Sequence, residues 1–133
     1  MNRRRMLVAV VVSVLGGGPF VATVSARSSS PPARILVYAQ EWSLWPSRPA
    51  LPAGKVTVQL WNRGQDAHDL RIRRLNSHGV MVGATQGVSI TQSGKLGQAN
   101  WKLGPGTYER YCSLPGHLMR GMHVRITVRA AHT

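Results

Sequence analysis

The chain has 133 residues, which is enough for one domain with a packed core. Its 17 Lys and Arg residues against 4 Asp and Glu give a formal net charge of +13, which favours an acidic protein face, anionic lipid headgroups or cell-wall polymers as partners. The sequence shows no nucleic-acid-binding motif, phosphate-binding glycine loop, Ser-His-Asp arrangement or paired carboxylates, which argues against nucleic-acid binding and against these enzyme classes.

Residues 1–26 have the features of a targeting segment. Arg3, Arg4 and Arg5 precede an apolar run over residues 6–15 that is too short to span a bilayer comfortably. Gly and Pro break this run, a small-residue cleavage site follows at residues 24–26, and "NRRRMLV" partly resembles a twin-arginine export signal. We expect export to the periplasm, cell envelope or exterior, with either cleavage of this segment or membrane anchoring through residues 6–26. Residues 27–33 should form a flexible leader.

Residues 34–133 contain short alternating runs separated by Gly, Pro and Asn, which is typical of an all-β domain. Residues 41–54 contain several prolines and predict an edge strand or a loop, and residues 76–98 hold only weak strand patterns. About seven to eight strands in this length predict a Greek-key β-sandwich. The clearest strands are expected at residues 34–39, 55–61, 68–75, 99–103, 107–112 and 122–130.

Strand phase directs four chemically active side chains toward one end of this sandwich. His68 and Met122 are each in phase with the apolar residues that follow them, so both should point inward at the start of a strand. Cys112 ends the strand before the last one, and His117 lies in the connection between these two strands. Cys112 alone would fit a small buried hydrophobe, but a thiolate, two imidazoles and a thioether together form the ligand set of a blue-copper electron-transfer site. Copper binding would also explain a single cysteine in an exported protein, where cysteines usually pair.

The segment "CSLPGHLMRGM" resembles the C-terminal copper loop of the cupredoxins, the family of plastocyanin, azurin and auracyanin. The segments "AGKVTVQLWNRGQDAHDLRI" and "LGPGTYERYC" resemble the family's first-histidine region and the strand before its cysteine. The resemblance implies a cupredoxin-like domain over residues 34–133 and one type 1 copper ion. It implies His68, Cys112 and His117 as strong equatorial ligands and Met122 as the long axial ligand.

Three residues bear on how this chain departs from the family. Asp69 stands where many relatives have Asn; its carboxylate could accept N–H groups from the copper loop and, when ionised, should lower the reduction potential. Arg110 shares strand phase with Cys112, so we expect its stem to reach the rim of the sandwich or a local bulge to turn it outward. Met119 is a rival thioether, but Met122 matches the family spacing and the inward strand phase.

The resemblance implies a one-electron shuttle rather than an enzyme, and we expect a monomer. A redox partner with an acidic face would dock on the apolar ring of Leu114, Pro115 and Leu118 around His117, and a membrane surface is an alternative partner. Two other functions stay open: a copper chaperone or storage protein on the same fold, and a metal-free β-sandwich interaction module with Cys112 buried and inert. The remaining histidines are expected to be solvated: His78, His123 and His132.

Overall fold

The computed structural model describes residues 31–131. The expected export segment, the start of the leader and His132 lie outside the described residues. Within residues 31–131 there is no helix with the length and hydropathy needed to cross a membrane.

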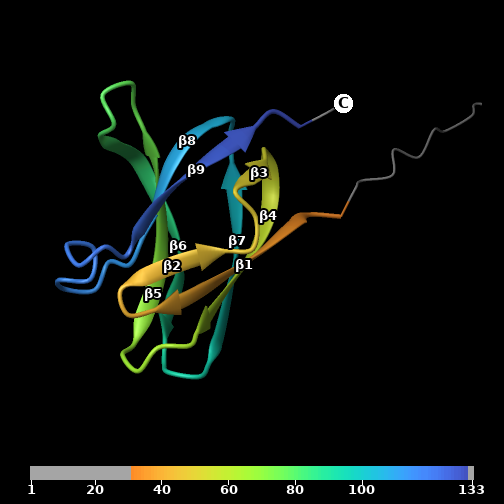
Figure 1. Ribbon diagram of the computed structural model, residues 1–133. Helices are drawn as coiled ribbons and strands as arrows, with labels where there is room; N and C mark the ends of the chain where they lie inside the picture. The colour runs from red at the N-terminus through yellow and green to blue at the C-terminus, as the bar shows by residue number, and fades with distance from the viewer. Residues whose placement is uncertain (1–30, 132–133) are drawn as a thin grey trace, which may run out of the picture.

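The described residues form nine strands in two sheets that pack against each other (Figure 1). One sheet has the order β2-β1-β4-β7, and the other has the order β3-β9-β8-β5-β6. The neighbours β1 and β4 run parallel, as do β3 and β9, and the remaining neighbours are antiparallel. The strands are β1 (Ala33–Gln40), β2 (Ser43–Pro46), β3 (Ala50–Pro52), β4 (Gly54–Asn62), β5 (His68–Leu75), β6 (Met81–Thr91), β7 (Leu96–Leu103), β8 (Gly106–Tyr111) and β9 (His123–Arg129).

The predicted all-β Greek-key sandwich is confirmed, with nine strands in the described residues rather than seven or eight. The proline-containing stretch supplies two short strands, β2 and β3, and each lies at the edge of a sheet, where proline is tolerated. The polar stretch with weak strand patterns contains the 11-residue β6, also an edge strand. Most of β6 is exposed, so its sequence lacks the apolar alternation that marks a half-buried strand.

The core lies between the two sheets and contains apolar side chains from both. On β4, Val56, Val58 and Leu60 are fully buried, as their alternation predicted. Leu70 and Ile72 of β5 supply buried side chains from the opposite sheet. Burial of such a side chain stabilises the fold by about 1.5–3 kcal/mol. This energy favours the arrangement in which the apolar residues of each alternating strand face the core and the polar residues face outward.

Strand register brings four chain segments to one end of the sandwich. Ala39, near the end of β1, lies opposite Asn62 at the end of β4. Tyr111, the last residue of β8, lies opposite both Arg71 of β5 and His123, the first residue of β9. The β8–β9 loop and the turn after β1 therefore lie at the same end as the start of β5 (Figure 1).

Candidate metal centre

His68, Cys112 and His117 come together at this end of the sandwich. Their three ligand atoms all lie within 4.8 Å of one another. The Nδ1 atoms of the two histidines are 3.2 Å apart, and Cys112 Sγ is 3.4 Å from His117 Nδ1. His68 and Cys112 are fully buried, whereas His117 is partly exposed. Two imidazoles and one thiolate at this spacing could hold a single ion such as copper or zinc, and they match the equatorial set of a blue-copper site.

The β8–β9 loop holds Cys112 and His117 in place through its own backbone. The N–H of His117 donates to the carbonyl of Leu114 at 3.1 Å, which closes a turn around Pro115 and Gly116. Gly116 has φ of +78°, a left-handed conformation that glycine adopts without strain. The Pro-Gly pair is therefore the local reason why this loop turns sharply just before the histidine.

Met122 closes the same loop and is fully buried. Its carbonyl accepts a hydrogen bond from the N–H of Cys112 at 3.0 Å, and its N–H donates to the carbonyl of His117 at 3.1 Å. These two bonds connect Met122 directly to two of the three clustered residues. Met119, the rival thioether, is 90% exposed, which favours Met122 as the axial ligand; that role stays a prediction.

Asp69 ties the start of β5 to the cysteine loop. Its carboxylate accepts hydrogen bonds from the N–H of Ser113 at 2.6 Å, from the Ser113 hydroxyl at 2.5 Å and from Arg71 Nε at 2.8 Å. Burial opposes ionisation, but the bonds from Ser113 and Arg71 outweigh it and lower the pKa of Asp69. The alternation of β5 puts Asp69 on the face opposite Leu70 and Ile72, where an exposed side chain would be expected; it is 1% exposed because the cysteine loop covers that face. The expectation that Asp69 accepts a hydrogen bond from the backbone of the copper loop is confirmed by the bond from the N–H of Ser113.

The Cys112 sulfur lies in a desolvated environment. Burial raises the pKa of the Cys112 thiol, hydrogen bonds from the backbone of Asp69 and Leu114 partly oppose this, and the negative charge of Asp69 reinforces it. The thiol therefore keeps its proton at neutral pH, and a metal ion held here would bind the sulfur as a thiolate.

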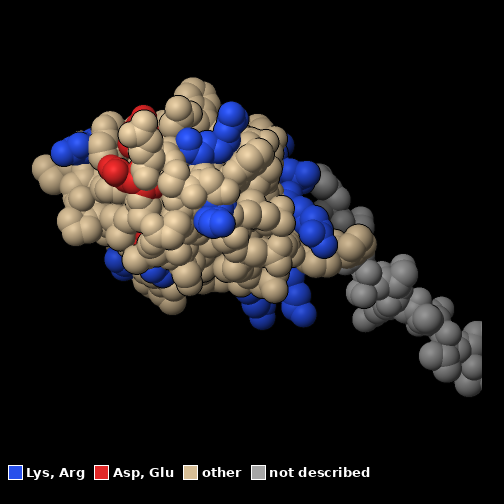
Figure 2. All heavy atoms as spheres, turned by 90° about the horizontal axis from the view of Figure 1, so that it is seen from below, with Lys and Arg blue, Asp and Glu red and all other residues tan. Residues whose placement is uncertain are grey.

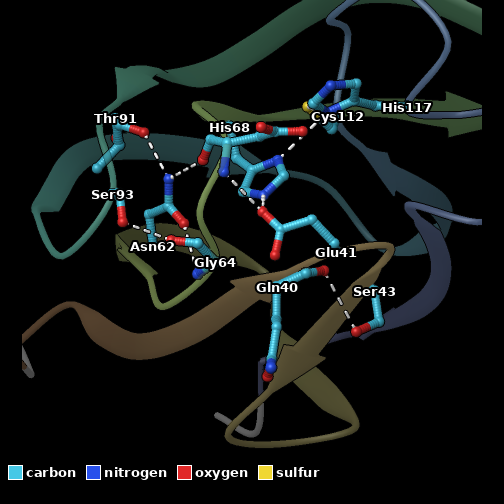
Figure 3. A network of polar contacts seen from close by, with 11 residues as sticks. Gln40, Glu41, Ser43, Asn62, Gly64, His68, Thr91, Ser93, Cys112 and His117 are labelled. Carbon is cyan, nitrogen blue, oxygen red and sulfur yellow. Dashed lines mark hydrogen bonds and ion pairs between the residues drawn. The ribbon is translucent and has the colours of Figure 1, made fainter.

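Glu41 is a site residue that the sequence analysis missed. Its Oε1 lies 3.1 Å from His68 Nε2, on the side of the ring away from His117 (Figure 3). Burial opposes ionisation of this carboxyl, but hydrogen bonds from the backbone of Asp66, from its own backbone and from His68 lower the pKa of Glu41. The only sequence signal was its rarity, since it is one of 4 acidic residues in the chain.

Trp42 is a second missed residue, and it covers the His117 side of the cluster. The two rings meet edge to face with centroids 5.0 Å apart. The guanidinium carbon of Arg120, from the β8–β9 loop, lies 4.3 Å from the centre of the Trp42 ring, in a cation–π arrangement. Nothing in the sequence around Trp42 indicates that the turn after β1 reaches the β8–β9 loop.

The expectation for Arg110 was wrong. Its side chain is 1% exposed, so the stem does not carry the charge to the rim, and β8 pairs with β9 in unbroken register, so no bulge turns it outward. Among the described residues, none forms a hydrogen bond with Nε, Nη1 or Nη2 of Arg110. Burial lowers the pKa of Arg110 to about 10. The strand phase predicted the inward direction of Arg110 correctly, and its guanidinium is buried inside the sandwich.

The other histidines in the described residues lie outside the cluster. His123 is exposed and its Nδ1 is 2.8 Å from Glu109 on the outer face of β8 and β9. His78 is exposed in the turn between β5 and β6. Both agree with the expectation of solvated side chains.

No protein-family model matches the sequence, and no curated protein matches it. Solved structures do match. Auracyanin B has a TM-score of 0.57 at 18% identity, with 78% of this chain and 93% of that chain covered. Auracyanin A from Chloroflexus aurantiacus, a "blue" copper protein, has a TM-score of 0.57 at 12% identity, with 76% and 100% covered. Rusticyanin from Thiobacillus ferrooxidans has a TM-score of 0.53 at 22% identity, with 76% and 79% covered.

Auracyanins and rusticyanin are cupredoxins. The same family has a copper loop and a strand before its cysteine that two segments of this sequence resemble. The likeness extends over both sheets, since about three quarters of the chain is covered in each comparison. The described residues therefore have the cupredoxin fold.

Proposed function

We propose that this protein is a one-electron carrier that holds one type 1 copper ion between His68, Cys112 and His117, with Met122 as the long axial ligand. The observation that carries the proposal is the convergence of two imidazole nitrogens and one thiol sulfur within 4.8 Å. When bound, copper would supply the chemistry by cycling between Cu(II) and Cu(I), taking one electron from a donor and passing it to an acceptor. Imidazole suits Cu(II) and sulfur suits Cu(I), so this set accommodates both states.

The surrounding chain suits electron transfer better than substrate chemistry. His68, Cys112 and Met122 are buried, and the backbone bonds of the β8–β9 loop hold the ligand positions. The partly exposed His117 offers a short route from these buried residues to the surface. A carrier rather than an enzyme is therefore the function that this geometry supports best.

A redox partner with an acidic face would dock at the His117 end. Pro115 is exposed there, Leu114 and Leu118 are half-buried, and Arg120 adds a cation. On the face in Figure 2, Lys and Arg side chains occur at several separate places, whereas Asp and Glu are confined mainly to one region. This excess of positive charge should speed encounter with an acidic partner. We also propose export, on the strength of the sequence features of residues 1–26.

Titration of the metal-free protein with Cu(II), followed by optical and EPR spectra, tests the copper site. We expect one equivalent to bind, with intense visible absorption from the thiolate and reversible reduction. Cys112→Ser should lose the colour and the characteristic EPR spectrum, whereas His123→Gln, which alters a histidine outside the cluster, should keep both. A colourless protein that binds and releases Cu(I) would favour a copper chaperone, and a protein that binds no copper would favour the metal-free interaction module.

A further inference from the structure

Glu41 is held in a position that suits it to orient one metal ligand. It comes directly after β1, and its Oε1 accepts a hydrogen bond from the N–H of Asp66 at 2.8 Å while lying 3.1 Å from His68 Nε2. One carboxylate oxygen therefore joins the turn after β1 to the loop that leads into β5.

Gly64 makes room for this carboxylate. A Cβ atom at Gly64 would overlap Glu41 Oε1 and would lie 2.6 Å from Oε2, closer than real Cβ atoms come to other atoms. Gly64 has no positive φ, so its backbone conformation does not call for glycine; its missing side chain leaves the space that the Glu41 carboxylate occupies.

A buried asparagine, Asn62, holds in place the loop that contains Gly64 and Asp66 (Figure 3). Asn62 Oδ1 accepts the N–H of Gly64 at 2.9 Å, and Asn62 Nδ2 donates to the carbonyls of Asp66 at 2.7 Å and Thr91 at 2.9 Å. The side chain is fully buried, so these bonds are shielded from water. The hydrogen-bonded loop holds Gly64 and the N–H of Asp66 where the Glu41 carboxylate can lie between them.

We propose that Glu41 is a positioning residue for His68: its carboxylate accepts a hydrogen bond from Nε2–H, which directs the unprotonated Nδ1 toward Cys112 and His117, and its negative charge favours the more positive oxidation state of the bound ion. A carboxylate is an acceptor, so the shared hydrogen resides on Nε2 and Nδ1 keeps its lone pair for the metal. Outer partners of this kind fix the tautomer and raise the basicity of a ligating imidazole. The proposal rests on the proposed copper function.

The test compares the wild-type protein with Glu41→Gln, Glu41→Ala and Gly64→Ala. Asp66→Asn is the matched control, because it removes an exposed charge from the same loop and keeps the backbone N–H that binds Glu41. In the copper-loaded proteins, we expect all three test variants to lower the affinity for Cu(II) relative to Cu(I) about tenfold, within the 10–100-fold range for outer partners of metal ligands. A tenfold change in that ratio raises the potential of a one-electron couple by about 59 mV. Asp66→Asn should change the ratio less than threefold.

A second measurement uses the metal-free protein and needs no copper. Nitrogen-15 NMR of the imidazoles should show His68 protonated on Nε2 in the wild type, with a slowly exchanging proton, and Glu41→Ala should lose that slow exchange. Gly64→Ala should also lose the slow exchange of this proton, because the added Cβ would displace the Glu41 carboxylate. The same result from both variants would attribute the change to the position of the carboxylate rather than to damage to the fold.

The outcomes separate the two proposals. A wild-type protein that never gives thiolate-to-copper absorption would overturn the proposed function and this inference with it. A coloured wild-type protein whose potential and His68 tautomer are unchanged in Glu41→Gln and Glu41→Ala would overturn the role of Glu41 alone. An equal shift in Asp66→Asn would also overturn it, because general loss of charge would then explain the result.

Discussion

Replacing Arg110 with methionine should stabilise the domain. The guanidinium is 1% exposed, and none of the described residues bonds to its three nitrogens. Its strand neighbours in register are Ile72 on β5 and Val124 on β9, which offer no charge. Burying an unpaired charge opposes folding, whereas methionine provides an unbranched apolar chain that can fill the same space.

The magnitude follows from the pKa of Arg110, which burial lowers well below its ordinary value, to about 10. At 1.36 kcal/mol per pKa unit, the buried charge costs about 3 kcal/mol. Because the folded state binds this proton less tightly than the unfolded state, the cost is complete below about pH 10 and fades as the pH rises toward the ordinary pKa of a guanidinium. Some of that cost is offset by lost packing of the stem, so we expect a gain of about 1–3 kcal/mol, or roughly 5–20 °C in Tm for a domain of this size.

Urea denaturation of the metal-free protein at pH 7 measures this gain without a contribution from metal binding. Arg129→Met is the matched control, because Arg129 is exposed near the end of β9 and the same substitution there should change the unfolding free energy by less than about 0.5 kcal/mol. If Arg110→Met lowered the stability while Arg129→Met left it unchanged, the reasoning would be refuted, since the guanidinium would then have favourable partners in solution.

Three further predictions concern the site. Asp69→Ala should lower the free energy of unfolding, measured by urea denaturation, by about 2–4 kcal/mol because Ser113 and Arg71 lose a charged acceptor. Asp69→Asn should lower it less and should raise the reduction potential of the copper-loaded protein, and an unchanged potential would contradict a charge effect. Trp42→Ala should speed copper loss to a chelator by uncovering His117, and Trp42→Phe should not; equal rates would contradict this shielding. Electron transfer with an acidic partner should slow as salt rises, and a salt-independent rate would argue against charge-guided docking.

The strands and the spacing of the clustered residues could be predicted because both depend on short-range pattern. Alternation placed Leu70 and Ile72 in the core, and with them His68, because side-chain direction repeats every two residues along a strand. Cys112 and His117 lie on a single loop, so their separation along the chain already limits how far apart they can be. Whether these residues bind copper stays a prediction.

Strand phase did not predict burial where another segment covers a face, and the desolvation cost of a charge did not turn an inward arginine outward. Asp69 lies on the outward phase of β5 but is buried, because the cysteine loop crosses over it. Arg110 follows its inward phase, against the desolvation cost that argued for a bulge or for an exposed guanidinium. Strand phase predicts the direction of a side chain, whereas its burial depends on whether another segment of the chain covers that face of the sheet.

The sequence by itself determined the all-β class, the inward strand faces and the grouping of Cys112, His117 and Met122 on one loop. Only the tertiary structure decided that Glu41 meets His68, because these residues are 27 positions apart. Their contact depends on the parallel pairing of β1 with β4, which carries the turn after β1 to the loop before β5. A parallel neighbour leaves no turn signal in the chain, so the partner of this imidazole becomes visible only when the two strands are placed side by side.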